Sequence, residues 1–248
     1  MSEPRSTYFT SITQVTYGAF NRLNLGVDFW FKSVLADGPG SSNALNVLRF
    51  PSTPNFSSKL GYVGPRFKTY IHKKWQGLTY QSSFLIPISQ DLENRNRSDQ
   101  SQFVFVEWDR YLWIQDIFWQ RMLSNKWQLF TKTAFWTSVP RDSYRTNWYL
   151  ETPVAAYVSF FPTRQITLLG TTEFWVKHTR DVPSASGQSN NEFAPFHSFF
   201  AHSGIGMKYQ IPGTQIELEA LYTKFWMGSN FEGAGQTFNA GIRWLYNR

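Results

Sequence analysis

The sequence predicts an all-β fold, a single up-and-down antiparallel transmembrane β-barrel of about twelve strands that occupies residues 1–248. Three observations predict it. Apolar and polar residues alternate with a period of two, which is the side-chain repeat of a β-strand. The connections between alternating segments are short and long in turn, as in transmembrane barrels. Aromatic residues make up 19% of the chain and charged residues 17%, and many rings lie where two membrane interfaces are expected.

The alternation is clearest in residues 23–32, 166–176 and 237–246, where one set of positions is apolar and the other is mostly polar. In the first of these segments, Leu25 and Val27 alternate with Asn24 and Asp28. Continued along the chain, the pattern predicts eleven strands, at residues 8–20, 23–33, 59–72, 78–88, 103–123, 127–139, 147–161, 166–179, 196–211, 216–227 and 237–247.

The connections alternate in length. Short ones are expected at residues 21–22, 73–77, 124–126, 162–165 and 212–215, and long ones at residues 34–58, 89–101, 140–146, 181–192 and 228–236. Bacterial single-chain barrels have an even number of strands, with short turns on the periplasmic side. Because eleven is odd, we expect a twelfth strand ahead of Met1. The first residues lack a secretory signal, so the protein is either cytosolic or exported with its signal removed, and the strand pattern favours export.

Aromatic pairs indicate the height of the membrane. Phe-Trp occurs five times, at residues 29–30, 118–119, 135–136, 174–175 and 225–226. Four of the pairs lie 8 to 11 residues beyond a short turn, which corresponds to about 20 to 28 Å of height in a tilted strand. That height is a bilayer's apolar thickness, so the pairs predict an outer girdle. A lower girdle is predicted from Trp75, Trp127, Phe160, Phe161, Tyr209 and Trp244.

Composition excludes several classes of protein. The net charge is +7, but the basic residues are scattered singly, which argues against nucleic-acid binding. There is no cysteine, and the four histidines are dispersed, so we expect neither thiol chemistry nor a metal site nor a cofactor. No run of residues is long and apolar enough for a membrane-spanning helix.

If the apolar positions face lipid, the polar positions face a lumen. The predicted lumen-facing residues are Asp28, Trp30, Lys32, Arg66, Lys68, Gln81, Lys132, Trp136, Glu151, Glu173, Trp175, Lys177, His202, Lys208, Glu217, Glu219 and Arg243. Charges of both signs fit either a water-filled channel or a narrow plug of salt bridges. The three tryptophans near the long-connection end form an aromatic constriction, provide an apolar ligand site, or pack against the loops.

Catalysis requires a nucleophile beside a base. The candidate pairs are His197-Ser198 and His202-Ser203, but adjacent strand residues point to opposite faces of a sheet. We therefore predict no catalytic residues and no enzyme.

Two segments carry a family resemblance. Tyr17-Gly18, followed by Asn21-Arg22-Leu23-Asn24-Leu25-Gly26-Val27-Asp28, and the closing strand at residues 237–246 resemble Gram-negative outer-membrane β-barrels. The hairpin is similar to that of transporter barrels of the "MetA-pathway of phenol degradation" type. The chain departs from the family's aromatic ending, since it closes on Tyr246-Asn247-Arg248. No functional residue carries over from the family.

The resemblance implies an outer-membrane location and the passage or binding of a small solute. Two alternatives remain open: a non-conducting scaffold or partner-binding barrel with a salt-bridged lumen, and an outer-membrane hydrolase. The expected partners are the lipid bilayer, a small-molecule solute and other outer-membrane proteins, with no nucleic acid.

Overall fold

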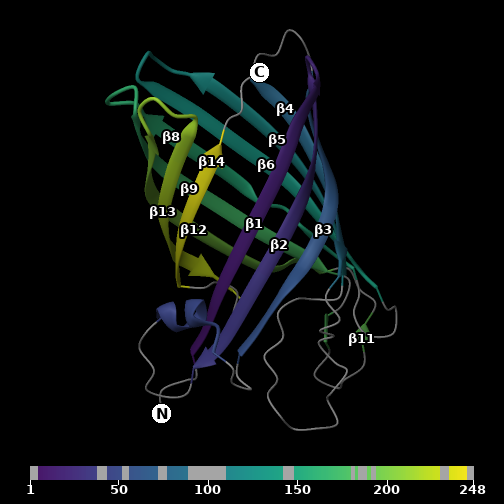
Figure 1. Cartoon of the computed structure of the whole chain (residues 1–248). Helices are drawn as coiled ribbons and strands as arrows, with labels where there is room; N and C mark the ends of the chain where they lie inside the picture. Colours follow the sequence, from purple (N-terminus) through teal and green to yellow (C-terminus); the bar gives the residue numbers. More distant parts are fainter. Residues whose placement is uncertain are drawn as a thin grey trace. The chain divides into compact units, whose positions relative to one another are not determined.

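The alternating segments form one antiparallel sheet. The computed structural model describes residues 5–37, 44–51, 56–71, 77–88, 110–141, 148–179, 182–183, 189–190, 194–229 and 235–244. The sheet consists of β1 (Arg5–Phe20), β2 (Leu23–Asp37), β3 (Phe56–Tyr70), β4 (Leu78–Pro87), β5 (Arg110–Met122), β6 (Trp127–Pro140), β7 (Tyr149–Glu151), β8 (Val154–Phe160), β9 (Ile166–Thr179), β12 (Ala194–Gln210), β13 (Ile216–Gly228) and β14 (Gln236–Trp244) (Figure 1). A short 3₁₀ helix, η1 (Ala44–Arg49), follows β2, and β10 (Val182–Pro183) pairs with β11 (Ser189–Asn190).

Strands that are consecutive in the chain are neighbours in the sheet, so the topology is an up-and-down meander. Within the described residues, β1 and β14 are the two edges of the sheet. β7 and β8 together fill one position, because β8 pairs with β6 and β9 while β7 continues the pairing with β9. The twelve strands therefore occupy eleven positions, which agrees with the eleven predicted segments. A strand ahead of Met1 stays a prediction.

The interruption between β7 and β8 has a chemical cause. Pro153 has no amide hydrogen and cannot donate to the sheet. Its carbonyl still accepts a hydrogen bond from the Ala134 amide at 2.9 Å, and the Thr152 amide donates to the Val176 carbonyl at 2.8 Å. The proline therefore removes one donor from the sheet without separating the neighbouring strands.

The connection lengths alternate as predicted. Short connections follow β1, β3, β5, β8 and β12, and longer ones follow β2, β4, β6, β9 and β13. In the turn after β12, Gly213 has a φ of 72°, which non-glycine residues rarely adopt. The Ile211 amide donates to the Ile216 carbonyl at 3.0 Å and closes this turn.

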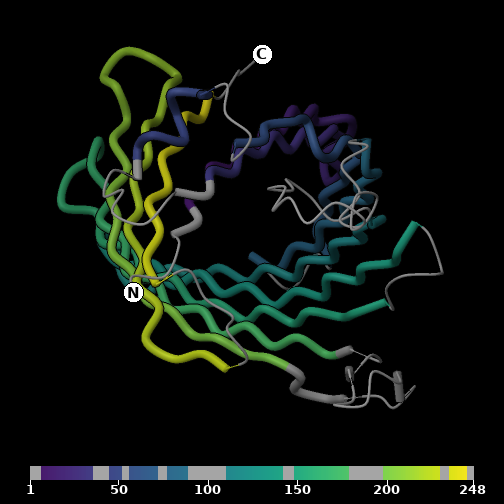
Figure 2. The backbone as a smooth tube through the Cα atoms, turned by 90° about the horizontal axis from the view of Figure 1, so that it is seen from below, coloured from purple at the N-terminus to yellow at the C-terminus, as the bar shows by residue number. Residues whose placement is uncertain are grey.

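The chain forms two compact units, and the predicted single domain over residues 1–248 stays a prediction. One unit comprises Met1–Lys68, Ser82–Ile114 and Ser138–Thr146. The other comprises Thr69–Gln81, Gln115–Thr137 and Asn147–Arg248. Within each unit, strands that follow one another in the chain run side by side (Figure 2).

The strands in each unit have a covered face, which carries buried and half-buried side chains, and an open face, which carries exposed ones. In β2 of the first unit, Asp28 is 1% exposed, whereas Leu25 is 46% exposed. In β9 of the second unit, Thr171 is 8% exposed and Phe174 is 39% exposed. In these strands polar side chains are covered while large apolar ones are open, which is the reverse of a water-soluble β-sheet protein.

The structure describes the second part of the strand predicted at residues 103–123. β5 begins at Arg110, and residues 103–109 lie outside the described residues. Within β5, Leu112 and Ile114 are buried on the covered face beside Asp116, while Trp113 is 46% exposed on the open face. Both faces are therefore apolar here, which explains why the alternation is weak.

Candidate functional site

Ion pairs between neighbouring strands lie on the covered face. In the first unit, Arg66 Nε of β3 lies 3.2 Å from Asp28 Oδ1 of β2, and it also donates to Ser83 Oγ of β4 at 3.3 Å. The Asp28 and Arg66 side chains are 2% and 11% exposed. Two charges so far from water are tolerated only when they neutralise each other. The pair therefore fixes the register of β2 against β3.

A second buried network joins β4, β5 and β6 in the other unit. Lys132 Nζ lies 3.4 Å from Asp116 Oδ1, and Gln81 Nε2 donates a hydrogen bond to Asp116 Oδ2 at 3.0 Å. Both carboxylate oxygens thus face a donor. The lysine ammonium also lies over the Trp136 ring, 5.3 Å from its centroid, which adds a cation–π contact.

Three further pairs follow along β9, β12, β13 and β14. His202 Nε2 lies 3.5 Å from Glu173 Oε2, and the two residues are direct neighbours across β9 and β12. Lys208 lies 2.7 Å from Glu219. Nearest the short connections, Arg243 lies 2.8 Å from Glu217. The Arg243 side chain is 57% exposed, whereas that of His202 is 14% exposed, so solvation of the basic partners decreases away from the short connections.

An aromatic ladder lies beside these charges. It consists of Trp136, Trp175, Phe200 and Phe225, contributed by β6, β9, β12 and β13. The ring centroids are 4.9 Å apart for Trp136 and Trp175, 5.4 Å for Trp175 and Phe200, and 5.1 Å for Phe200 and Phe225. His202 completes the group, with its ring centroid 5.0 Å from that of Phe225. These separations are typical of favourable ring pairs.

The structure places the predicted lumen-facing residues at covered-face positions of their strands. Five pairs or networks bring together Asp28 with Arg66, Gln81 and Lys132 through Asp116, Glu173 with His202, Lys208 with Glu219, and Glu217 with Arg243. Lys177 lies over the Tyr149 ring at 4.5 Å, and Lys32, Lys68 and Glu151 are half-buried. That this face lines a lumen stays a prediction.

The three tryptophans predicted to act together belong to different units. Trp136 and Trp175 are in contact within the aromatic ladder. Trp30 lies in the first unit, where it is 8% exposed and packs edge-on against Tyr62 at 5.8 Å.

Sequence reasoning missed two buried charges and two rings. Asp116 and Arg110 are 4% and 5% exposed. Their strand also places leucine and isoleucine on the covered face, so its sequence gave no polar stripe. Phe200 and Phe225 were not expected among the lumen residues. Alternation could have identified them, because Phe200 lies two residues before His202 and Phe225 six residues after Glu219, each on the same face as its partner in the strand.

The open face carries part of the predicted girdles. Trp226 is 61% exposed, and its indole donates to Ser203 Oγ at 3.1 Å. Near the short connections, Trp127, Tyr209 and Trp244 are 44%, 38% and 69% exposed. Trp75 lies outside the described residues. The two side chains of a Phe-Trp pair lie on different faces: Phe174 is on the open face, and Trp175 is on the covered face.

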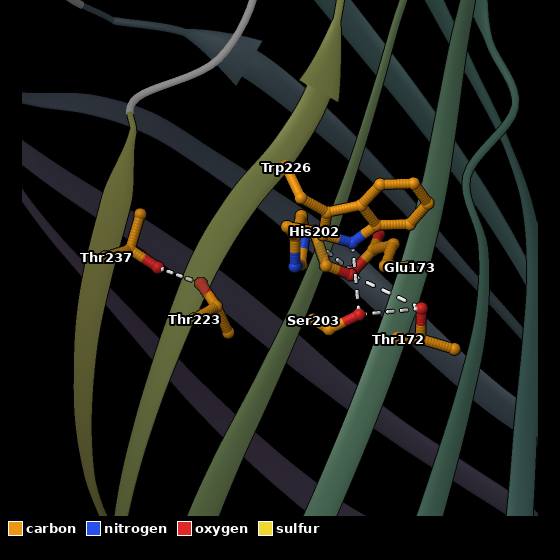
Figure 3. Close-up of polar contacts among 7 residues, drawn as sticks. All are labelled: Thr172, Glu173, His202, Ser203, Thr223, Trp226 and Thr237. Atoms are coloured by element: carbon orange, nitrogen blue, oxygen red, sulfur yellow. Dashed lines mark hydrogen bonds and ion pairs between the residues drawn. The ribbon is translucent and has the colours of Figure 1, made fainter.

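The candidate catalytic pair has its side chains on opposite faces. His202 points to Glu173, whereas Ser203 donates to Thr172 Oγ1 at 3.1 Å on the other side of the sheet (Figure 3). The side chain of His197 lies outside the described residues. Among the described residues, no three His, Asp or Glu side chains are grouped as metal ligands. In the same part of the chain, no helix is long and apolar enough to cross a membrane.

Comparison with known proteins supports the fold. No family model matches the sequence, and no curated protein matches it. The structure is similar to that of an outer membrane channel from Pseudomonas putida F1, with a TM-score of 0.59 and 10% sequence identity over 96% of this chain and 81% of the channel. Its description as an outer membrane channel agrees with the resemblance of this chain to Gram-negative outer-membrane β-barrels. The predicted fold is therefore confirmed: the chain has the all-β, up-and-down antiparallel fold of an outer-membrane β-barrel.

Proposed function

We propose that the chain is a channel of the Gram-negative outer membrane and lets a small solute pass along its covered face. The observation that carries this proposal is the inverted distribution of side chains. Asp28 is 1% exposed, whereas Ile205, Phe238 and Ile242 are 71%, 79% and 78% exposed. Such a surface is unfavourable in water and suits the acyl chains of a bilayer, so the bilayer is the first partner. The fold shared with an outer membrane channel supports the same role.

The covered face also suits a solute with both polar and apolar parts. Acid and base side chains alternate from strand to strand, which gives a polar surface with little local net charge. The aromatic ladder lies next to it and offers ring faces to an apolar group. A solute that moves along the ion-paired surface and the aromatic ladder exchanges water for protein contacts in small steps. This arrangement favours transport over catalysis.

The second candidate is a non-conducting scaffold whose interior is closed by ion pairs and whose loops bind other outer-membrane proteins. The burial of the Asp28–Arg66 pair favours it, because water reaches neither partner readily. The more solvated Lys208–Glu219 pair favours a wet path, since these side chains are 26% and 38% exposed.

Planar-bilayer recording of the refolded chain separates the two candidates. The same preparation is first checked by its gel mobility unheated and boiled, because a folded barrel migrates differently in the two states. We expect steady single-channel current for a channel. Silence across salts and voltages, from protein that shows the mobility shift and inserts into vesicles, would contradict the channel and support the scaffold.

Ring contact with the solute is tested by current block. Small solutes with and without a ring are added to the wild type and to Phe200→Leu, which keeps an apolar side chain but removes the ring. We expect ring-bearing solutes to block longer in the wild type only. Equal block times in both proteins would remove the aromatic ladder from the transport path.

A further inference from the structure

A row of polar residues interrupts the open face of the second unit. Ser203 of β12 is opposite Thr172 of β9 on one side and Lys224 of β13 on the other, and Lys224 is opposite Gln236 of β14. We call these four residues the polar row. Below it, toward the short connections, the same face is apolar and exposed, with Ile205 and Met207 on β12 and Phe238 on β14. The row is therefore a local exception on a hydrophobic surface.

Hydrogen bonds organise the row. Ser203 Oγ donates to Thr172 Oγ1 at 3.1 Å, and the Trp226 indole donates to Ser203 Oγ at 3.1 Å (Figure 3). A β-bulge positions this indole. Ala201 is opposite Met227 and His202 is opposite Phe225, so Trp226 is the extra residue in its strand. The hydroxyl and indole groups are thus held together on the open face.

The charge of Lys224 has no carboxylate on its own side of these strands. In the described parts of β9, β12, β13 and β14, the acidic residues are Glu173, Glu217 and Glu219. Each is paired with a basic residue on the covered face. Lys224 is exposed on the opposite face, beside two hydroxyl groups. A cation among neutral donors suits an anion from outside the chain.

The row lies about 5 Å below the expected level of the lipid headgroups, a distance that an extended lysine side chain can span. Lys224 and Trp226 lie eight and ten residues beyond Ile216, where β13 begins. At about 3.3 Å per residue and a tilt near 40°, this is roughly 20 and 25 Å above the short-connection end. A bilayer's apolar layer in such barrels is about 25 Å thick, and an exposed indole prefers its boundary.

We propose that the polar row binds the phosphate group of an anionic lipid at the outer interface of the membrane. Lys224 supplies the charge and the Gln236 amide supplies an N–H donor to the phosphate oxygens, while the hydrogen bonds of Ser203 and Thr172 hold the polar row together. Trp226 sets the depth at which the acyl chains begin. The inference rests on the proposed membrane location but not on conduction, since every residue of the row is on the face opposite the ion pairs.

Lipid binding to the folded full-length chain tests the proposal. The protein is released from detergent in a native mass spectrometer after incubation with phosphatidylglycerol, with lipid A, or with phosphatidylcholine. The variants are Lys224→Gln, Lys224→Arg and the double variant with Thr172→Val and Ser203→Ala. Lys126→Gln is the matched control, because Lys126 is also exposed but lies in a short connection at the other end.

We expect Lys224→Gln to weaken binding of the two anionic lipids about fivefold, since one lysine near an anionic surface contributes about 1 kcal/mol. Lys224→Arg retains binding, the double variant weakens it, and Lys126→Gln and phosphatidylcholine show no change. Anionic lipid binding that is equal in the wild type and Lys224→Gln overturns the proposal.

Inorganic phosphate is the competing source of the same chemistry. If millimolar phosphate displaces the lipid and itself binds in a Lys224-dependent way, the lipid assignment is overturned in favour of a free-anion site. Gel mobility, vesicle insertion and conductance are measured on the same samples. Protein that does not insert contradicts the membrane location, whereas inserted protein with Lys224-independent lipid binding contradicts this inference alone.

Discussion

Replacing Asp28 by Asn removes one negative charge from a site that water barely reaches. Arg66 stays protonated at any accessible pH, so its charge then lacks this partner. At 3.2 Å, and with an effective dielectric constant near 20, the lost attraction is about 5 kcal/mol. Relief of the carboxylate's own desolvation offsets part of it. We therefore expect Asp28→Asn to lower the free energy of unfolding by about 3 kcal/mol, within the range for breaking buried pairs.

Urea unfolding of the refolded protein in detergent, followed by tryptophan fluorescence, measures this loss. Adding Arg66→Met to Asp28→Asn should restore most of the lost free energy of unfolding, because the arginine charge is then no longer buried. The matched control is Glu217→Gln, whose partner Arg243 is 57% exposed, and its cost should be below about 1 kcal/mol. Equal costs for the two single variants would refute the reasoning and mean that water solvates both pairs alike.

Three other variants, the first with its own control variant, test packing, the open face and the ladder. Gly64→Ala should lower the free energy of unfolding by about 2 kcal/mol or more in the same urea assay, because the new methyl group overlaps the Phe84 carbonyl. The control variant Gly170→Ala should have little effect, because no atom lies near its added carbon. Trp226→Phe should cost about 1 kcal/mol in stability through the lost indole hydrogen bond, and an unchanged unfolding midpoint would count against it. Trp175→Ala should raise single-channel conductance by removing a ring from the path, and an unchanged or lower conductance would place that ring outside the path.

The fold was accessible from the sequence because alternation is a local signal. β9 begins and ends at the predicted residues 166 and 179, and its alternation alone assigns Glu173 and Phe174 to different faces. The alternating connection lengths then leave few topologies other than a meander. Where both faces are apolar, as around Leu112 in β5, alternation no longer identifies the covered face.

The site was only partly accessible, because pairing depends on the register between strands. The sequence identifies Lys132 as a covered-face cation but not its contact with Asp116, which lies on another strand. The aromatic ladder depends in the same way on Phe200 lying opposite Trp175. The polar row was equally hidden, since one bulge determines on which face Trp226 lies. Such features require coordinates, or covariation between positions distant in sequence.

The proline between β7 and β8 has a consequence for local stability. Above it, β7 is held to β9 by three opposed residue pairs, from Tyr149 opposite Thr179 to Glu151 opposite Lys177. Below it, β8 is opposed by seven pairs on each side. This strand should therefore open from its β7 end, and amide hydrogens there should exchange faster than those of β8. β7 can then open while the strand beneath the proline keeps its place.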